Sequence, residues 1–313
     1  MFTIKQPSAI IFGKHSARDY DMPKDPLVIT SKGAKSRGWL DYTRLNSATI
    51  FDNVEPNPSI ETVEKIINEF STANFSHVVG LGGGSSLDVA KYVAFKLKKR
   101  KIMVPTTFGS GSEVTRISVL KVNGKKQSFH DDGIFADVAI VDSFFIYSSE
   151  ENVIKNSAID ACAQCTEGFD SKLGNEYTKF LCKKAFDLLE DGILHDNKEN
   201  IVLGSLFAGL GFGNCSTTLG HALSYVYSNE GYSHGHALAF TTTVAHQYNQ
   251  SVFYDRFLKI VKKLNFSKIN LKQNLDDAAS LILTDRKHLD NNPKNVAKDD
   301  VVLLLKKVNS LTI

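Results

Sequence analysis

Four residues in the second half of the chain have the side chains and the spacing of a metal site. Asp160 and Gln164 lie four residues apart, and His221 and His234 follow in the run GHALSYVYSNEGYSHGHALAF. Residues four apart on a helix share one face, so the carboxylate and the amide point the same way. With two imidazoles they can hold a divalent cation, which polarises a carbonyl group. Any one of them alone would equally fit a core aspartate or a surface histidine.

A glycine-rich turn in the first half of the chain is typical of phosphate binding. The run VVGLGGGSSLDVAKYVAF places it between an apolar strand pattern and a helix pattern. Glycines let backbone amides approach phosphate oxygens, and the start of a helix adds partial positive charge. The run matches neither the P-loop nor the usual GxGxxG fingerprint. The candidate phosphate-binding residues are Gly82, Gly83, Gly84, Ser85 and Asp88.

A second polar turn, PTTFGSGSEVTR, follows the next apolar strand pattern. Its hydroxyls and amides suit the sugar or nicotinamide part of a dinucleotide, although an ordinary Gly-Ser loop has the same composition. The candidate residues are Thr106, Thr107, Ser110 and Ser112. The two turns together favour a nicotinamide dinucleotide as the cofactor.

The end of the strand pattern LVIT bears on which dinucleotide is bound. An acidic side chain there would hydrogen-bond the ribose hydroxyls and repel an additional phosphate. Ser31 and Lys32 stand there instead, with Lys35 and Arg37 nearby. These residues suit a 2′-phosphate, so the sequence favours NADP(H) over NAD(H). A solvated basic turn is the alternative.

The pattern of apolar residues changes near residue 148. Before it, short apolar runs alternate with helical periodicity, which is typical of βαβ units and a parallel sheet. After it, helix-length periodic segments dominate. We therefore predict a Rossmann-like α/β dinucleotide-binding domain over residues 1–148 and an all-α domain for the metal and the substrate over residues 149–313.

The individual elements follow from the same periodicities. Predicted strands occupy residues 27–30, 49–51, 77–81, 102–104 and 138–141. Predicted helices occupy residues 59–70, 88–99, 175–189, 201–212, 274–283 and 298–308. The pair Asn123 and Gly124, flanked by strand patterns, predicts a tight hairpin beside the parallel sheet.

The composition argues against several classes of partner. The 313 residues include 37 basic and 34 acidic side chains, a balance too even to predict binding to nucleic acid or an anionic membrane. No apolar stretch is long enough to cross a bilayer, and the first residues lack a signal-peptide pattern. The four cysteines are too few for a disulfide framework and fit a reducing compartment. We expect a cytoplasmic protein, with a homodimer as the default assembly.

Several segments, taken together and in order, resemble the iron-dependent (group III) alcohol dehydrogenases. Their superfamily also holds glycerol dehydrogenase and dehydroquinate synthase. The segments are IIFGK (10–14), EPNPS (55–59), GGGSSLDVAK (82–91), PTTFGSGSEVTR (105–116), ADVAIVD (136–142), IDACAQCTEG (159–168), and GHALSY with SHGHA (220–237). The resemblance covers most of the chain and implies the two-domain fold of that family.

The resemblance also assigns residues. In that family one metal, usually iron or zinc, is held by an Asp, a His four residues later and two further His. Asp160, His221 and His234 match three of these positions, and Gln164 falls where the family usually has its first His. An amide oxygen is neutral and harder than imidazole, which indicates weaker zinc retention or a preference for iron or another oxygen-tolerant ion. Tyr225 stands where many relatives carry another His near the nicotinamide.

The implied reaction is reversible hydride transfer between NAD(P)H and a small, often anionic aldehyde. The nearest branch is that of the phosphonoacetaldehyde reductases and short semialdehyde reductases. The proton comes from water, the ribose hydroxyl, Tyr225 or His236, and His236 equally well fits a helix cap. Two alternatives stay open. One is a non-catalytic nucleotide-binding protein with a decayed metal site, and the other is a dehydroquinate synthase-like lyase.

Overall fold

The computed structural model describes residues 1–312 of the chain. Its contacts define two compact units, which we call the sheet unit and the helical unit. The sheet unit is Thr3–Glu150, and the helical unit runs from Glu151 onward and includes Met1 and Phe2. The division falls close to the predicted boundary after residue 148.

The sheet unit is built on one six-stranded parallel sheet. Its strands are β1 (Ala9–Phe12), β2 (Leu27–Ile29), β3 (Thr49–Phe51), β4 (His77–Gly82), β5 (Arg100–Pro105) and β8 (Val138–Val141). They lie side by side in the order β1-β8-β5-β4-β2-β3, and each neighbouring pair is parallel. All three residues of β2 are fully buried, as expected where helices cover both faces of a strand.

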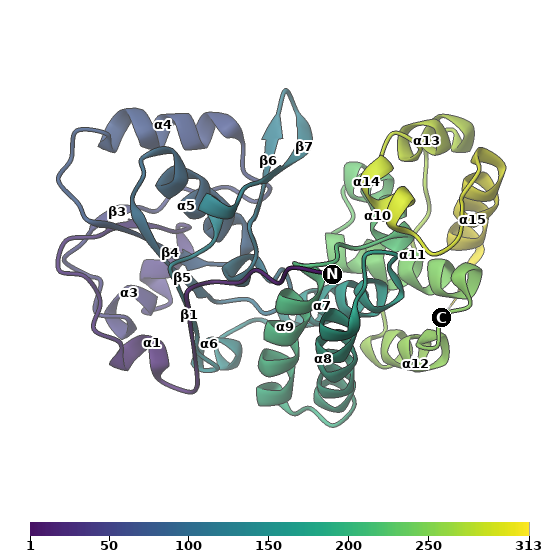
Figure 1. Ribbon diagram of the computed structural model, residues 1–313, viewed down its shortest axis with the longest axis horizontal. Helices are drawn as coiled ribbons and strands as arrows, with labels where there is room; N and C mark the ends of the chain where they lie inside the picture. The colour runs from purple at the N-terminus through teal and green to yellow at the C-terminus, as the bar shows by residue number, and fades with distance from the viewer. Residues whose placement is uncertain (313) are drawn as a thin grey trace. The chain divides into compact units, whose positions relative to one another are not determined.

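Helices cover both faces of this sheet. They are α1 (Ser16–Asp19), α2 (Gly33–Ser36), α3 (Trp39–Tyr42), α4 (Ile60–Phe70), α5 (Gly84–Lys96) and α6 (Phe144–Tyr147). In Figure 1, α4 and α5 lie on one side of the sheet, and α1, α3 and α6 lie on the other. The parallel strands and the two helical layers confirm the predicted α/β class.

The predicted strands are confirmed, and β3 and β8 have the predicted bounds. Asn123 and Gly124 have φ angles of 50° and 76° and join β6 (Ile117–Val122) to β7 (Lys125–His130) in a separate antiparallel sheet, as predicted. Two of the differences from expectation have a clear physical cause. The strand β1 was not predicted, because its four residues form a short edge strand that is only partly buried. The helix α5 begins at Gly84 rather than at residue 88, because Gly83 is its N-cap and the glycine run continues into the first turn.

The helical unit contains only helices among the described residues 151–312. They are α7 (Glu151–Asp170), α8 (Glu176–Leu194), α9 (Lys198–Phe212), α10 (Leu219–Asn229), α11 (His234–Asn249), α12 (Tyr254–Leu264), α13 (Leu275–Ile282), α14 (Arg286–Asn291) and α15 (Lys298–Ser310). The helix α7 packs against α8, α9, α10 and α11. This central place lets one helix position side chains of several others.

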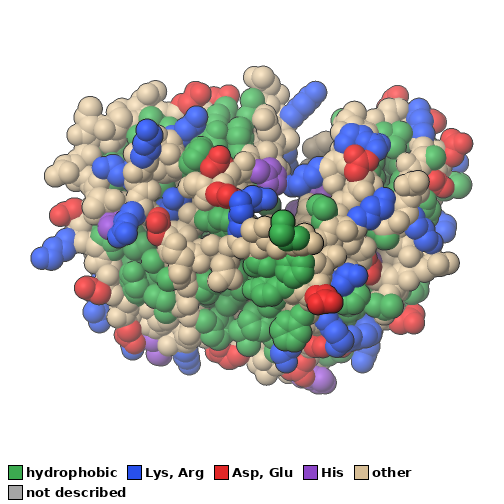
Figure 2. Space-filling view, in the orientation of Figure 1, with side chains coloured by type: hydrophobic (Ala, Val, Ile, Leu, Met, Phe, Trp, Pro, Cys, Tyr) green, Lys and Arg blue, Asp and Glu red, His purple; other side chains and the backbone are tan. Residues whose placement is uncertain are grey.

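The surface agrees with the near balance of charges in the sequence. Figure 2 shows basic and acidic side chains interspersed on the face in view, without an extended region of one sign. Among the described residues, no helix combines the length and the apolar character that crossing a membrane requires.

Candidate metal centre and nucleotide-binding turns

Three of the four predicted metal ligands meet in the helical unit. The ligand atoms of Asp160, His221 and His234 all lie within 4.8 Å of one another. The Oδ1 atom of Asp160 is 3.8 Å from Nε2 of His221 and 3.9 Å from Nε2 of His234. Asp160 comes from α7, His221 from α10 and His234 from the first position of α11. One carboxylate oxygen and two imidazole nitrogens are a common donor set for zinc and iron.

Gln164 lies beside these three residues and has an unusual feature. Its Nε2 atom donates a hydrogen bond to Oδ1 of Asp160 at 2.9 Å. Its Oε1 atom is buried and has no hydrogen-bond partner in the structure. A buried acceptor without a partner costs about 1–3 kcal/mol, so such atoms are rare unless a ligand satisfies them. A half-turn of the amide group would exchange its oxygen and nitrogen, so Gln164 fits a role as an oxygen donor to a cation at this cluster.

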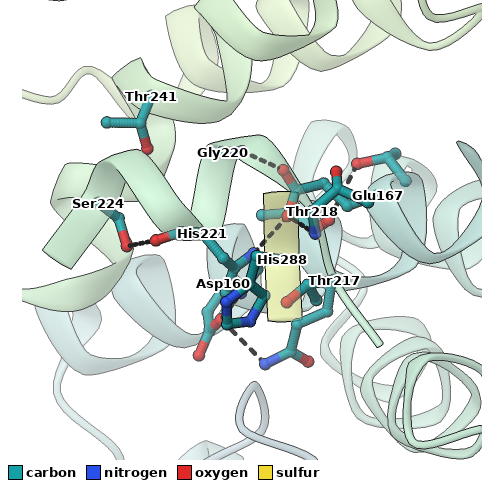
Figure 3. Close-up of polar contacts among 12 residues, drawn as sticks. Asp160, Glu167, Thr217, Thr218, Gly220, His221, Ser224, Thr241 and His288 are labelled. Atoms are coloured by element: carbon teal, nitrogen blue, oxygen red, sulfur yellow. Dashed lines mark hydrogen bonds and ion pairs between the residues drawn. The ribbon is translucent and has the colours of Figure 1, made fainter. Parts of the chain in front are cut away.

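Glu167 orients one of the imidazoles from behind. This side chain is 1% exposed, and its Oε2 atom lies 2.5 Å from Nδ1 of His221. It also accepts hydrogen bonds from the backbone amides of Thr218 and Gly220, at the start of α10 (Figure 3). With Nδ1 bound to the carboxylate, Nε2 of His221 faces Asp160. A carboxylate behind a ligating imidazole is the arrangement found at many metal centres, where it fixes the ring and its tautomer.

The charges of this pair depend on each other. Burial by itself would raise the pKa of Glu167, but His221 and the Thr218 amide outweigh it and hold the pKa at about 2. Burial lowers the pKa of His221, and the carboxylates of Glu167 and Asp160 more than reverse this, to about 9. A metal must therefore displace a proton from Nε2 of His221. This competition makes metal binding stronger as the pH rises.

Two further polar residues lie near the cluster. The ring of Tyr225 is nearly parallel to that of His234, with ring centroids 6.4 Å apart. Burial raises the pKa of Tyr225 above its usual value, so its hydroxyl stays protonated. His288, from α14, stacks against His221 with centroids 6.2 Å apart, and its Nδ1 atom lies 2.6 Å from Oδ2 of Asp285.

His236 is placed away from the cluster, contrary to the expectation that it handles a proton at the metal. Its Nε2 atom lies 2.5 Å from the carbonyl oxygen of Ser267, and its ring stacks on Phe266 with centroids 5.1 Å apart. The reason is helical geometry. Residues two apart on a helix point to nearly opposite sides, so a ring at His236 cannot share the direction of His234.

Glu167 and His288 were not among the predicted site residues. Glu167 could have been found, because it lies seven residues after Asp160 and three after Gln164, on the same helix face. His288 had no such signal, because it lies far along the chain in the short helix α14.

The two polar turns of the sheet unit meet at the carboxyl ends of β4 and β5. A Cβ atom at Gly83 would lie 3.1 Å from Oγ1 of Thr107, and one at Gly84 would lie 2.9 Å from Oγ of Ser110. The glycines thus bring the backbone of the first turn against the side chains of the second. Ser31 and Lys32 follow β2, which pairs with β4, so they lie at the same edge of the sheet. Ligands of open parallel sheets bind at this edge.

The remaining candidates in the turns have different surroundings. Thr106 is buried, and its Oγ1 atom has no hydrogen-bond partner. The hydroxyl of Ser85 accepts a hydrogen bond from the backbone amide of Asn57 at 3.3 Å. Asp88 and Ser112, also predicted to bind the cofactor, are hydrogen-bonded to each other. The Ser112 hydroxyl donates to Oδ1 of Asp88 at 2.6 Å, so these two side chains hold the second turn in place.

A buried charged cluster of Lys91 and Asp88 packs against the second turn. The Nζ atom of Lys91 is fully buried and donates to the carbonyl oxygens of Ser112 at 2.7 Å, of Thr115 at 3.2 Å and of Ile117. Burial lowers the pKa of Lys91 and raises that of Asp88, 3.5 Å away. The cluster fixes the backbone of the turn through three carbonyl groups at once.

Glu113 belongs to the same turn and predicts a pH dependence of stability. Burial raises the pKa of this side chain from 4.5 to about 7. Between these values the folded protein holds a proton that the unfolded chain releases, so the free energy of unfolding falls as the pH rises. The loss is about 3 kcal/mol across this range. Urea unfolding at several pH values should show that Glu113→Gln removes the part of this slope that the Glu113 side chain contributes.

The exposed residue Glu64 provides the control for this measurement. Glu64→Gln should leave the slope as it is in the original protein. An undiminished slope in Glu113→Gln would show that the proton is held elsewhere.

Comparison with known proteins places this architecture in a family. The chain belongs to the iron-containing alcohol dehydrogenase family. Residues 7–143 match the iron-containing alcohol dehydrogenase domain, and residues 154–282 match the C-terminal domain of the Fe-containing alcohol dehydrogenase family.

The individual curated relatives share about a third or less of their residues with this chain over the matched segments. The 4-hydroxybutyrate dehydrogenase of Clostridium kluyveri is 32% identical over 209 residues, which are 58% of this chain and 56% of that protein. The matched segments cover 56%, 31% and 53% of three curated relatives, so the chain spans only about half of their length or less.

Solved structures share the fold. The iron-containing alcohol dehydrogenase of Thermotoga maritima has a TM-score of 0.89 at 24% identity, covering 99% of this chain and 100% of that one. The sulfoacetaldehyde reductase of Bifidobacterium kashiwanohense, solved in complex with NAD+, has a TM-score of 0.90 at 24% identity, with 100% of both chains covered. At this level of identity the likeness establishes the fold alone.

Proposed function

We propose that the chain is a metal-dependent oxidoreductase that interconverts a small anionic aldehyde and its primary alcohol with NAD(P)H. The observation that carries the proposal is the cluster of Asp160, His221 and His234, with the partnerless Oε1 atom of Gln164 beside it. These four side chains would hold the cation. A divalent cation bound there acts as a Lewis acid on a carbonyl oxygen, and we favour Fe²⁺ over Zn²⁺ because Gln164 supplies an amide rather than an imidazole.

The residues around the cluster have defined roles in this proposal. Glu167 keeps the Nδ1 atom of His221 engaged, so that Nε2 is directed at the cation. Tyr225 keeps its hydroxyl proton because burial raises its pKa, and it lies next to His234. It is therefore our preferred residue for donating a hydrogen bond toward the alcohol oxygen of the product.

The sheet unit would bind the dinucleotide, which supplies the hydride. The amides of the first turn at the start of α5 suit the phosphates, and Thr107 and Ser110 of the second turn lie against that turn. The exposed Lys32 and the lack of an acidic residue after β2 favour NADP(H). The names of two similar proteins support an anionic substrate, because 4-hydroxybutyrate and sulfoacetaldehyde are both small anions.

The test is an assay of the purified protein, loaded with Fe²⁺ or Zn²⁺ without oxygen, on phosphonoacetaldehyde, succinic semialdehyde and malonic semialdehyde. We expect NADPH oxidation with at least one of them and a lower KM for NADPH than for NADH. Propanal, an uncharged aldehyde, is the control and should have a lower kcat/KM.

Failure to turn over any aldehyde, with the metal restored, would overturn the proposal. It would favour a nucleotide-binding protein whose metal site has decayed. Full activity after complete removal of the metal would instead refute the metal dependence.

A further inference from the structure

One face of α7 carries more than the two candidate ligands. Asn156, Asp160, Gln164 and Glu167 follow one another at intervals of four, four and three residues, so they form a single stripe along the helix. The inner two are the candidate ligands. The outer two accept hydrogen bonds from the first turns of the two helices that bring the other ligands, α10 and α11.

The Glu167 end of the stripe holds the start of α10. The N-cap residue of α10, Thr218, makes no side-chain capping bond. The Glu167 carboxylate instead accepts the backbone amides of Thr218 and Gly220, and it binds the ring of His221 as well. A side chain of α7 thus replaces the missing cap and orients the ligand of the capped helix.

The Asn156 end has the same relation to α11. The N-cap residue Ser233 makes no capping bond of its own, and its hydroxyl donates to Oδ1 of Asn156 at 2.5 Å. The same Oδ1 atom accepts the backbone amide of His236, in the first turn of α11, at 3.0 Å. The Nδ2 atom donates to the carbonyl oxygen of Asn152 at 2.8 Å, which fixes the amide so that its oxygen faces α11.

The backbones of the two helices touch at this point. A Cβ atom at Gly235 would lie 2.1 Å from the carbonyl oxygen of Asn156, which is far inside van der Waals contact. Only glycine fits between them. The first turn of α11, which begins with His234, is therefore seated directly on α7 next to Asn156.

We propose that Asn156 is a positioning residue of the metal centre. It caps α11 from a neighbouring helix and thereby holds His234, the most exposed of the three clustered ligands at 33% of its side chain. The inference rests on the proposed metal site. Without the cap, the first turn of α11 loses an acceptor for its free amides and frays, and the His234 imidazole loses its fixed direction.

The test measures metal binding directly, by titrating Zn²⁺ against a competing chelator and by recording the visible absorption spectrum of bound Co²⁺. Asn156→Ala should weaken Zn²⁺ binding by about 10–100-fold, the usual effect of removing a group that orients a ligand. It should also alter the Co²⁺ spectrum. Asn156→Asp should bind more tightly than Asn156→Ala, because a carboxylate still accepts the hydrogen bonds from Ser233 and His236 and suits a helix N-terminus, although it loses the Nδ2 donor to Asn152.

Matched variants separate positioning from charge and from folding. Asn152→Asp places the same added charge one turn earlier on α7 and keeps a side-chain oxygen for the Nδ2 atom of Asn156, which donates to Oδ1 of Asn152 at 3.1 Å, so it should change neither the affinity nor the spectrum. Asn156→Gln keeps the amide but moves its oxygen by one methylene, so it should weaken binding as alanine does. This variant tests the same hydrogen bonds should Asn156→Ala fail to fold.

The outcomes distinguish the positioning role of Asn156 from the existence of the metal site. If Asp160→Ala binds Zn²⁺ as well as the original protein, the metal site itself is refuted. If Asp160→Ala abolishes binding while Asn156→Ala and Asn156→Gln bind within about twofold, the metal site stands and the role of Asn156 is overturned.

Discussion

Replacing Asp160 with alanine is expected to abolish measurable Fe²⁺ binding and to lower kcat for aldehyde reduction by at least about 10²–10³-fold. That is the scale of rate lost with one group that stabilises developing negative charge. The reason is geometric and electrostatic. Oδ1 of Asp160 lies 3.8 Å from Nε2 of His221 and 3.9 Å from Nε2 of His234, and Asp160 supplies the carboxylate of the three-residue cluster. Without it, a cation would face two neutral imidazoles and an amide, with no charged ligand in direct contact to offset its loss of water.

The measurement is the iron content per chain after anaerobic dialysis, followed by kcat at saturating NADPH. Glu151→Ala is the matched control, because it removes an exposed carboxylate from the first turn of the same helix. It should retain both metal and activity. Asp160→Ala that keeps near one ion per chain would contradict the assignment of the metal centre.

The sequence predicted the fold well where burial imposes a pattern. The residues of β2 and β8 are apolar because helices cover both faces of the sheet, so these strands stand out as short apolar runs. The edge strand β1 lacks this constraint and gave no comparable signal. The start of α5 was predicted too late, because glycine is a poor helix former and nothing in the residue pattern shows that an N-cap at Gly83 continues directly into helix.

The site was predicted where helical spacing and residue type act together. Asp160 and Gln164 share a face of α7. His221 lies in the first turn of α10 and His234 is the first residue of α11, and both of these helices pack on α7. The sequence could not show which polar side chains have partners within the fold. Asp88 carries the charge of a binding residue but is bonded to Ser112, and His236 is turned toward Phe266.

Gln164→His is expected to strengthen Zn²⁺ binding by about 10–100-fold. A change at a ligand position should affect metal affinity at least as much as the loss of a group that only orients a ligand. Two changes act in the same direction. An imidazole nitrogen is a better donor for zinc than an amide oxygen. The substitution also removes the amide group whose Nε2 atom now bonds to Oδ1 of Asp160 and competes with a cation for that oxygen. The gain for Fe²⁺ should be smaller, so the preference should shift toward zinc.

Gln164→Ala decides whether the amide itself binds the metal. It removes both the hydrogen bond to Asp160 and the buried Oε1 atom that has no partner. If Oε1 is a ligand, Gln164→Ala should bind Zn²⁺ and Fe²⁺ more weakly than the original protein. If Gln164 only competes for Asp160, the alanine variant should bind both ions at least as tightly, and a three-residue site would be sufficient. Chelator competition with both ions, on all three proteins, gives the answer. A Gln164→His variant that binds zinc no more tightly than the alanine variant would show that position 164 is not directed at the metal.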